Sequence, residues 1–428
     1  MDETIRKNKN YFLIYAIGLS LFVFFIVLVR AATTAITWDE AFTYIAYAKN
    51  FHINQLIDIH SNYANNHILN TLMIFVVNKL CGLQYNELVI RLPNIIMLIF
   101  YFIGSYIFAK DEKNKYLLFS GLILNYYVME FFGLARGYGI ATCIIIWMYY
   151  FFKKAIKQNY DDKNILLSCL FGLIACYANT VSILALGTIC SVYFIELIRK
   201  KKVVKFVKRN ILKIIPLIIF FIYIVIFHFI VTGADKPVFG EVEGATIIGF
   251  FKHNFIWMFI QNETVNIILS ITILITIILC IILFRKKMEE MPFFVSLFIL
   301  LLYLILPSII LQKPFLIERC LVPLWPLFIA GVVEIFNLLT QKVPNNIVKL
   351  LTATCTLLLL FMFCIRINIR ETRDWKDNYK VRDIVHSALY NHRTLTKEEY
   401  DEIRKIYGIT FYREKILEQY EFDIIPKE

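Results

Sequence analysis

Long apolar runs recur along this chain, and the polar segments between them are short. A helix needs about 20 residues to cross the hydrocarbon core of a bilayer, so apolar runs of about 18 residues or more indicate membrane spans. Of the 428 residues, 59% are hydrophobic, whereas about 45–50% is usual for a soluble domain. The sequence therefore predicts an all-α polytopic membrane protein with about eleven transmembrane helices. The candidate spans are 11–30, 88–109, 116–133, 136–152, 165–179, 181–198, 211–231, 265–284, 292–311, 317–337 and 347–366.

The positive charges indicate how these spans cross the membrane. The net charge is +12, which in a soluble protein would suggest nucleic acid as a partner. Here the basic runs lie between apolar runs, as Lys and Arg do in the cytoplasmic loops of membrane proteins, so no nucleic-acid partner is expected. Arg6, Lys7 and Lys9 precede the first apolar run, which at 11–29 is too long for a typical cleaved signal core. We therefore expect a cytoplasmic N-terminus in a multi-pass protein of the cytoplasmic membrane.

The segment 67–82 decides on which side every later loop lies. Its apolar part is shorter than the roughly 20 residues that a span needs. If this segment lies on the outer interface as an amphipathic helix, most Lys and Arg fall in cytoplasmic loops, as is usual for membrane proteins. If it spans the membrane, every later loop changes sides and most Lys and Arg fall in outer loops. The interfacial placement gives a transmembrane domain over 1–366, with a helical first outer loop over 31–87 and a short extracytoplasmic helical tail over 367–428.

The C-terminal tail is polar and charged, and it is too short for a sizeable independent domain. Thr396 followed by Glu399 is the pattern of a capping box, which predicts a short helix that continues to about Tyr407 and stops at Gly408. We expect a few helices docked on the outer face of the membrane.

The first substantial polar interval, 38–71, follows the first apolar run and carries Asp39 and Glu40 side by side. A carboxylate just past a helix end at a membrane surface can act as a general base on a hydroxyl or bind a cation. The pair also fits a solvated turn, or a helix N-cap before the helical-looking stretch that follows. Because caps are common, the cap is the favoured interpretation of the pair alone.

Asn66 and His67 close the same interval and begin the amphipathic segment. Backbone N–H groups and side-chain amides at such a helix start can bind a phosphate or sugar hydroxyls. Polar caps at an interfacial helix start are the structural alternative, and a lone histidine is more often a hydrogen-bonding residue than a metal ligand. None of the nine cysteines forms a CxxC pair, so neither a zinc site nor a disulfide framework is expected.

Two arginines lie at the ends of predicted spans. Arg91 opens the second span, and Arg136 lies between two later spans, with Glu130 one to two helical turns before it. Charges this close to the bilayer are costly and usually face the protein interior or a cavity. Arg136 could instead reach the outer headgroups or form a structural pair with Glu130.

A charged cluster precedes the tenth predicted span. Lys313, Glu318 and Arg319 stand there among prolines that break or bend the helix. Such a cluster at the outer mouth suits the phosphate of a lipid-linked substrate, which an arginine could grip with two hydrogen bonds. Ordinary anchoring at the membrane interface explains the same residues equally well.

Several short motifs follow one another along the chain. They are WDEAFTY with Asp39 and Glu40; Asn66-His67-Ile68-Leu69-Asn70-Thr71; Glu87, Arg91, Leu92 and Pro93; Ala135-Arg136-Gly137-Tyr138; ERCLVPLWP with Glu318 and Arg319; and Asp374-Trp375-Lys376. In this order they resemble the GT-C superfamily of polytopic glycosyltransferases, in particular the bacterial relatives of protein O-mannosyltransferases and of the lipid A aminoarabinose transferase. Each motif alone is weak, but their order and spacing over roughly 1–380 are more specific.

The resemblance implies an inverting transfer of a sugar from a polyprenyl-phosphate donor to an acceptor hydroxyl at the outer face of the membrane. It makes Asp39 the base, while Glu40 orients Asp39 or a positive group. The candidates to neutralise the leaving phosphate are Arg136, Arg319, Lys313 and His67. Negative charge develops on this phosphate in the transition state, so positive groups are needed there most. The residues implied in substrate and donor-phosphate binding are Asn66, His67, Arg91, Arg136, Tyr138, Lys313, Glu318 and Arg319.

The implied acceptor is an envelope glycan, lipid or protein, and nothing in the sequence identifies it or the sugar. No cofactor is expected and no metal is required, although the pattern leaves room for a divalent cation. The chain departs from the family in four places. Gly-Ile-Ala-Thr follows Tyr138 where some relatives carry an acid, Ile68 replaces a proline, Cys320 replaces a tyrosine, and the C-terminal domain is reduced to a tail.

A polytopic transporter or flippase for a lipid-linked saccharide is the alternative. That class tends to show ionisable residues at the membrane midplane, broken helices in both halves and repeat symmetry. The predicted spans are nearly free of charge except near their ends, and no internal repeat is evident, although Pro307 and Pro323 leave room for broken helices. A non-catalytic envelope scaffold is a third possibility.

Overall fold

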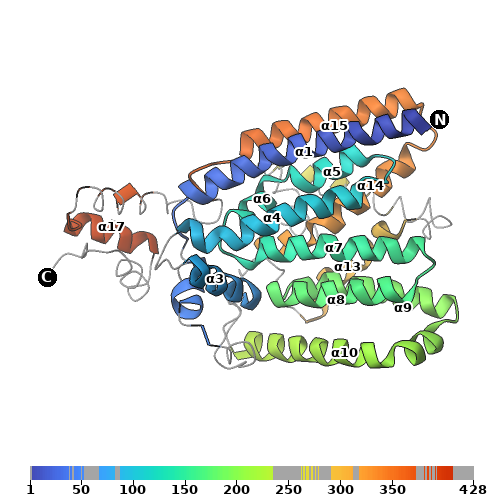
Figure 1. Ribbon diagram of the computed structural model, residues 1–428, viewed down its shortest axis with the longest axis horizontal. Helices are drawn as coiled ribbons and strands as arrows, with labels where there is room; N and C mark the ends of the chain where they lie inside the picture. Colours follow the sequence, from blue (N-terminus) through green and yellow to red (C-terminus); the bar gives the residue numbers. More distant parts are fainter. Residues whose placement is uncertain are drawn as a thin grey trace.

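The structure, a computed structural model, is a bundle of helices that run roughly along one direction (Figure 1). It describes residues 2–37, 39–40, 43–49, 51–52, 67–81, 87–234, 291–311, 318–372 and 393–407, with single residues and pairs of residues between 262 and 278 and between 380 and 391. Nearly all of these residues are helical, and none of them forms a β-strand. The elements in chain order are α1 (Asp2–Thr33), η1 (Thr43–Ala48), α3 (Ile68–Cys81), α4 (Glu87–Ala109), α5 (Lys115–Ile123), α6 (Tyr126–Phe132), α7 (Gly137–Lys157), α8 (Asp162–Ala178), α9 (Ser182–Arg199), α10 (Val203–Ala234), α13 (Pro292–Leu311), η5 (Glu318–Leu324), α14 (Trp325–Leu339), α15 (Asn345–Arg366) and α17 (Lys397–Tyr407).

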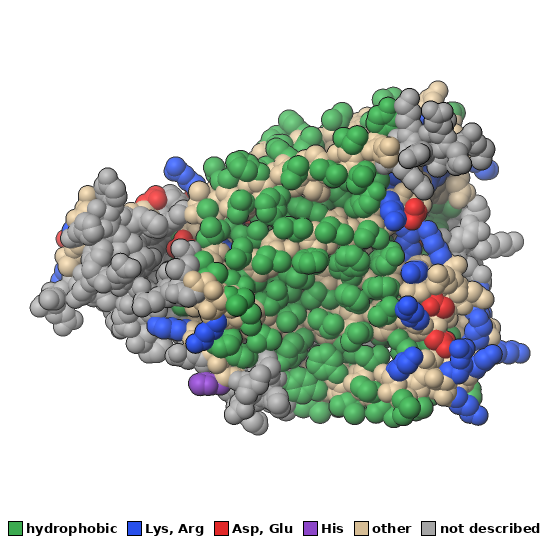
Figure 2. Space-filling view, viewed as in Figure 1, with side chains coloured by type: hydrophobic (Ala, Val, Ile, Leu, Met, Phe, Trp, Pro, Cys, Tyr) green, Lys and Arg blue, Asp and Glu red, His purple; other side chains and the backbone are tan. Residues whose placement is uncertain are grey.

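Within the described residues, seven helices are long and apolar enough to cross a membrane. Apolar side chains form a broad belt across the middle of the visible face, and Lys and Arg gather at the end of the bundle where the N-terminus lies (Figure 2). Such a belt is what the hydrocarbon core of a bilayer covers. The predicted all-α class is therefore confirmed for the described residues, and the apolar helices support a membrane protein. The seven helices are Asn10–Thr33, Glu87–Ala109, Gly137–Lys157, Ser182–Arg199, Val203–Ile226, Arg319–Leu339 and Asn345–Arg366.

The other predicted spans have different outcomes. The prediction of one continuous span over 116–133 is wrong, because the chain there forms two short buried helices, α5 and α6. The side chain of Asn125 accepts hydrogen bonds from the backbone N–H groups of Tyr127 at 2.9 Å and Val128 at 3.2 Å. An asparagine that caps in this way starts a new helix in place of continuing the old one. Two further predictions correspond to α8, which has 17 residues, and to α13, whereas 265–284 lies mostly outside the described residues.

Helix α7 forms the centre of the bundle, packed between α4 and α8. Glycines allow the close approach of these helices, as small residues often do between membrane helices. A Cβ atom on Gly104 of α4 would lie 2.9 Å from Cγ2 of Ile146 of α7, and one on Gly172 of α8 would lie 3.0 Å from Sδ of Met148 of α7. At the periphery, α10 and α15 are only 11% buried over their most apolar stretches, so their apolar side chains face the surroundings.

Two shorter helices match their predicted bounds. Helix α3 has 14 residues, with Ile68, Thr71 and Ile74 buried on one face and Leu80 81% exposed, so it is too short to span a bilayer. Helix α17 begins with the predicted capping box. The backbone N–H of Thr396 donates to Glu399 Oε2 at 2.9 Å, and the N–H of Glu399 donates to Thr396 Oγ1 at 3.2 Å. In Figure 1, α3 and α17 lie toward the end of the bundle opposite the N-terminus.

Candidate functional site

The site is built around a fully buried ion pair between Arg91 of α4 and Glu40 of the polar interval. Arg91 Nε donates to Glu40 Oε1 at 2.8 Å, and Arg91 Nη2 donates to Glu40 Oε2 at 2.8 Å. The remaining N–H groups of the guanidinium donate to the backbone carbonyls at the end of α1. These are the carbonyls of Ala31 at 2.9 Å, Thr34 at 2.7 Å and Ala35 at 3.1 Å. Arg91 thus ties the end of α1 to the start of α4 with every donor in use.

The carboxylate of Glu40 is equally well satisfied. Besides Arg91, it accepts hydrogen bonds from the backbone N–H of Thr37 at 2.9 Å and of Ala135 at 2.6 Å. Burial alone would raise the pKa of Glu40, but Arg91 and these donors outweigh it and lower the pKa below its ordinary value. Because Thr37 Oγ1 accepts from the N–H of Glu40 at 3.2 Å, the two residues also form a capping box. Glu40 therefore positions its neighbours.

The turn before Arg136 is held from both sides. The N–H of Ala135 donates to Glu40, and the carbonyl of Ala135 accepts from Asn70 Nδ2 at 3.0 Å. Asn70 Oδ1 in turn accepts from Asn94 Nδ2 of α4 at 2.9 Å. With both backbone groups of Ala135 fixed, Arg136 leaves the turn in a defined direction, at the N-terminus of α7.

Asp39 lies between two arginines from distant parts of the chain. Asp39 Oδ2 is 3.6 Å from Arg136 Nη2 and 3.6 Å from Arg319 Nη1. Arg136 is further fixed by bonds from Nη1 to the backbone carbonyl of Asp39 at 3.2 Å and to Thr43 Oγ1 at 3.0 Å. The side chain of Arg136 is fully buried and that of Asp39 is 6% exposed, whereas that of Arg319 is 23% exposed. Arg319 thus lies on the open side of the cluster.

His67 completes the cluster as a neutral side chain. Its ring lies edge-on to Tyr138 with 4.8 Å between centroids, and the guanidinium of Arg136 is 5.9 Å from the centroid of the Tyr138 ring. The imidazole donates to the carbonyl of Ala178, and because Nε2 has no partner among the described residues, the donor is Nδ1–H. Burial, together with Arg136 and Arg319, lowers the pKa of His67 well below 6.5. A neutral His67 offers Nε2 as a hydrogen-bond acceptor, not a positive charge.

Gly137 allows this close arrangement. A Cβ atom at Gly137 would lie 2.2 Å from the carbonyl oxygen of Ala178 and 2.6 Å from His67 Cβ. No side chain fits between these backbones, so the glycine after Arg136 is required for His67 and the end of α8 to reach the start of α7.

The structure brings together most of the predicted site residues. Asn66 and Lys313 lie outside the described residues, and Glu318 begins η5 but its side chain is not described. The alternative pairing of Arg136 with Glu130 is not found, because Glu130 Oε2 lies 3.5 Å from Arg30 Nη2, whereas Arg136 pairs with Asp39. The residues that the structure gathers at one end of the bundle are Asp39, Glu40, His67, Arg91, Arg136, Tyr138 and Arg319.

Three supporting residues are not predicted from the sequence: Thr37, Thr43 and Asn94. Thr37 could have been found, because Thr-x-x-Glu is itself a capping-box pattern. Thr43 and Asn94 act through residues far away in the sequence, so no local pattern reveals them.

The cluster presents two guanidinium groups to one carboxylate. Arg136 and Arg319 both lie 3.6 Å from the same oxygen of Asp39. Within the part of the chain that the structure describes, no three His, Cys, Asp or Glu side chains converge as metal ligands. Two guanidinium groups with a neutral imidazole nearby suit a phosphate. No family model, curated protein or solved structure significantly matches this chain.

The Glu40–Arg91 pair should be essential to stability. Glu40→Gln leaves Arg91 buried without its counter-charge, which typically costs about 3–5 kcal/mol. We expect the midpoint of thermal unfolding in detergent to fall by about 5 °C or more. Glu196→Gln is the control, because it removes an ion pair at the helix surface that contributes about 0–1 kcal/mol. Equal midpoints for the two variants would contradict this account.

His67 should make stability depend on pH. Its pKa is lower in the folded protein than in the unfolded chain, so the unfolded chain binds the proton more readily. Stability should therefore be complete above about pH 6.5 and fall as the pH decreases below it, by at most about 1.4 kcal/mol per pH unit. We expect unfolding midpoints measured from pH 7.5 to 5 to depend less on pH in His67→Asn than in the wild type.

His52→Asn is the matched control, since His52 is exposed. It should keep the pH dependence of the wild type. If His67→Asn keeps it as well, His67 is not the group responsible.

Proposed function

We propose that this protein is a membrane glycosyltransferase that moves a sugar from a polyprenyl-phosphate donor to an acceptor hydroxyl. The observation that carries the proposal is Asp39 held between Arg136 and Arg319, three residues that come from three of the motifs resembling the GT-C superfamily. A carboxylate beside two guanidinium groups provides the two functions that the reaction requires. The carboxylate accepts a proton, and the guanidinium groups stabilise a leaving phosphate.

In the proposed reaction, the oxygen of the acceptor hydroxyl attacks the anomeric carbon of the donor. Asp39 takes the hydroxyl proton as the new carbon–oxygen bond forms. The bond between the anomeric carbon and the phosphate oxygen breaks on the opposite face, so the configuration inverts. The phosphate leaves on the polyprenol with an additional negative charge, which Arg136 and Arg319 neutralise.

Binding of the donor would release Asp39 from its arginine partners, so that it could accept the proton. The 3.6 Å separations from Asp39 to Arg136 and to Arg319 exceed the roughly 2.7–2.9 Å of a strong charge-assisted hydrogen bond. A donor phosphate carries more negative charge than a single carboxylate and competes for both guanidinium groups. Arg319, the more exposed of the two, would turn toward the phosphate first and leave Asp39 facing the acceptor. Glu40 and Arg91 serve as positioning residues, because their own hydrogen bonds are fully used within the protein.

The neutral imidazole suggests a particular role for His67. With Nε2 as an acceptor near Tyr138, His67 would receive a hydrogen bond from a hydroxyl of the sugar or of the acceptor. This role differs from neutralising the leaving phosphate, the role that the resemblance implies for the same residue. It also provides a polar group near the position where some relatives carry a second acid.

The loss of Asp39 should abolish transfer. Asp39→Asn keeps the size of the side chain but removes the proton acceptor, a change that typically slows a reaction by about 10²–10⁴-fold. The assay supplies labelled polyprenyl-phosphate sugar to membranes that contain the protein and follows product formation. Asp111→Asn is the control, because Asp111 is exposed on the turn after α4, away from the cluster.

If Asp39→Asn retains full turnover while the protein is correctly inserted, Asp39 is not the base. Transport can be separated from transfer in the same membranes. Movement of the labelled lipid across the bilayer without a new glycosidic bond would favour a transporter or flippase.

The proposed topology places the cluster on the outer side of the cytoplasmic membrane. It keeps about eleven crossings, with α5 and α6 together counted as one of them, a cytoplasmic N-terminus and the tail 367–428 outside. The described part of the tail, α17, lies at the same end of the bundle as α3, opposite the N-terminus, which supports this arrangement (Figure 1).

A tag at each terminus of the chain tests this topology. An epitope after Glu428 should be digested by protease added to intact spheroplasts, whereas a tag before Met1 should be protected until the membrane is opened. The opposite pattern of protection would place the cluster in the cytoplasm, where an outer-leaflet donor does not reach it.

A further inference from the structure

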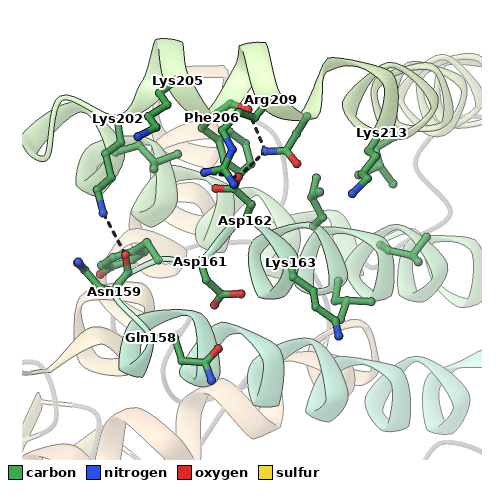
Figure 3. Close-up of a pocket in the computed structure, with 17 residues that line it drawn as sticks. Gln158, Asn159, Asp161, Asp162, Lys163, Lys202, Lys205, Phe206, Arg209 and Lys213 are labelled. Atoms are coloured by element: carbon green, nitrogen blue, oxygen red, sulfur yellow. Dashed lines mark hydrogen bonds and ion pairs between the residues drawn. The ribbon is translucent and has the colours of Figure 1, made fainter.

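A groove lies at the end of the bundle opposite the Asp39 cluster. It has a volume of about 870 Å³ and lies between the turn after α7, the first half of α8 and the start of α10. Figure 3 shows Lys205, Arg209 and Lys213 on α10 and Lys202 directly before this helix, with the polar α7–α8 turn on the other side. Helix α7 begins beside His67 and ends at Lys157, so its length separates the groove from the candidate site.

The two acidic residues that line the groove already have hydrogen-bond or ion-pair partners within the protein. Asp161 caps α8 by accepting from the N–H of Asn164 at 3.1 Å. Asp162 Oδ2 accepts from Asn210 Nδ2 at 2.9 Å and lies 3.5 Å from Arg209 Nη1. Against these two acids the groove is lined by five basic side chains, which are Lys163, Lys202, Lys205, Arg209 and Lys213.

Lys205 and Lys213 carry the unbalanced charge. Both line the groove, both are exposed, and neither forms a hydrogen bond or ion pair with a residue that the structure describes. With Arg209, and with Lys202 directly before the helix, they are spaced three and four residues apart, as on one face of a helix. The result is a basic stripe over about 16 Å of helix, since each residue adds about 1.5 Å.

The turn opposite this stripe is held in an unusual conformation. Asn159 and Tyr160 have φ values of 55° and 61°, a region that a bulky side chain rarely adopts. Lys200 fixes the turn, with Nζ 2.6 Å from Asn159 Oδ1 and 4.3 Å from the centroid of the Tyr160 ring. Such conformations persist where the surroundings enforce them and often at functional positions. The polar wall of the groove is thus preformed.

The other end of the groove is apolar. Leu166, Leu170 and Leu217 line it, and the sequence of α10 is apolar from Ile214 onward. Because α10 is only 11% buried over its spanning stretch, the groove meets the apolar belt that faces the bilayer. The basic stripe therefore lies where lipid headgroups end, and the leucines lie where acyl chains begin.

We propose that this groove binds an anionic glycerophospholipid of the surrounding membrane. The headgroup phosphate interacts with Lys205 and Lys213, and the acyl chains lie along Leu166, Leu170 and Leu217. Basic grooves between membrane helices commonly recognise anionic lipids in this way. The apolar half of the groove favours a lipid over a free anion, which would leave the leucines uncovered. This proposal does not depend on the proposed glycosyltransferase activity.

The test compares lipid retention in a double variant with that in a matched control. The full-length protein is exchanged into nanodiscs that contain phosphatidylglycerol or phosphatidylcholine, extracted, and examined by native mass spectrometry for bound lipid. The double variant Lys205→Gln and Lys213→Gln should bind phosphatidylglycerol about 10- to 30-fold more weakly than the wild type, with phosphatidylcholine binding unchanged. The control, Lys110→Gln with Lys349→Gln, removes the same charge from exposed positions outside the groove and should retain phosphatidylglycerol.

Three results would overturn the proposal. They are equal retention in the double variant and the wild type, equal loss in the double variant and the control, and displacement of the lipid by inorganic phosphate at millimolar concentration. The last result would identify a site for a free anion, because a lipid held also by its acyl chains resists such displacement.

Discussion

The buried pair of Glu40 and Arg91 is the interaction on which the described arrangement depends. It joins the end of α1, the start of α4 and the turn before α7. Burying two charges is costly unless every donor and acceptor finds a partner, and here the guanidinium and the carboxylate are both fully hydrogen-bonded within the protein. The hydrogen bonds of Glu40 fix the backbone at Thr37, before Asp39, and at Ala135, before Arg136. Asp39 and Arg136, two of the candidate functional residues, are therefore held by a fixed backbone.

The apolar pattern predicted the class of fold and several helix bounds, because hydrophobic runs and capping boxes are local signals. It could not predict the break at Asn125, since one polar residue within a long apolar run has little effect on a hydropathy average. The motifs identified Glu40 and Arg91 separately, but their partnership joins residues 51 positions apart. The neutral state of His67 depends on burial and on two arginines from other segments, so it required the tertiary structure.

The two ends of the bundle offer different settings for negatively charged groups. At one end, Arg136 is buried beside Asp39 and its orientation is fixed by Thr43 and by the backbone, which suits a reacting phosphate that must be held in one geometry. At the other end, Lys205 and Lys213 are exposed at the edge of an apolar surface, which suits a lipid headgroup that needs charge more than alignment. Arginines thus form the proposed phosphate site at one end, and lysines form the proposed lipid site at the other.

The central claim is that Arg136 and Arg319 form a phosphate site that shares Asp39. A cryo-electron microscopy structure of the wild-type protein with polyprenyl phosphate bound, the leaving group of the proposed reaction, tests it most directly. We predict that phosphate oxygens lie within hydrogen-bond distance of both guanidinium groups and that Arg319 moves away from Asp39. A phosphate bound elsewhere, with Asp39 still paired to both arginines, would contradict the account.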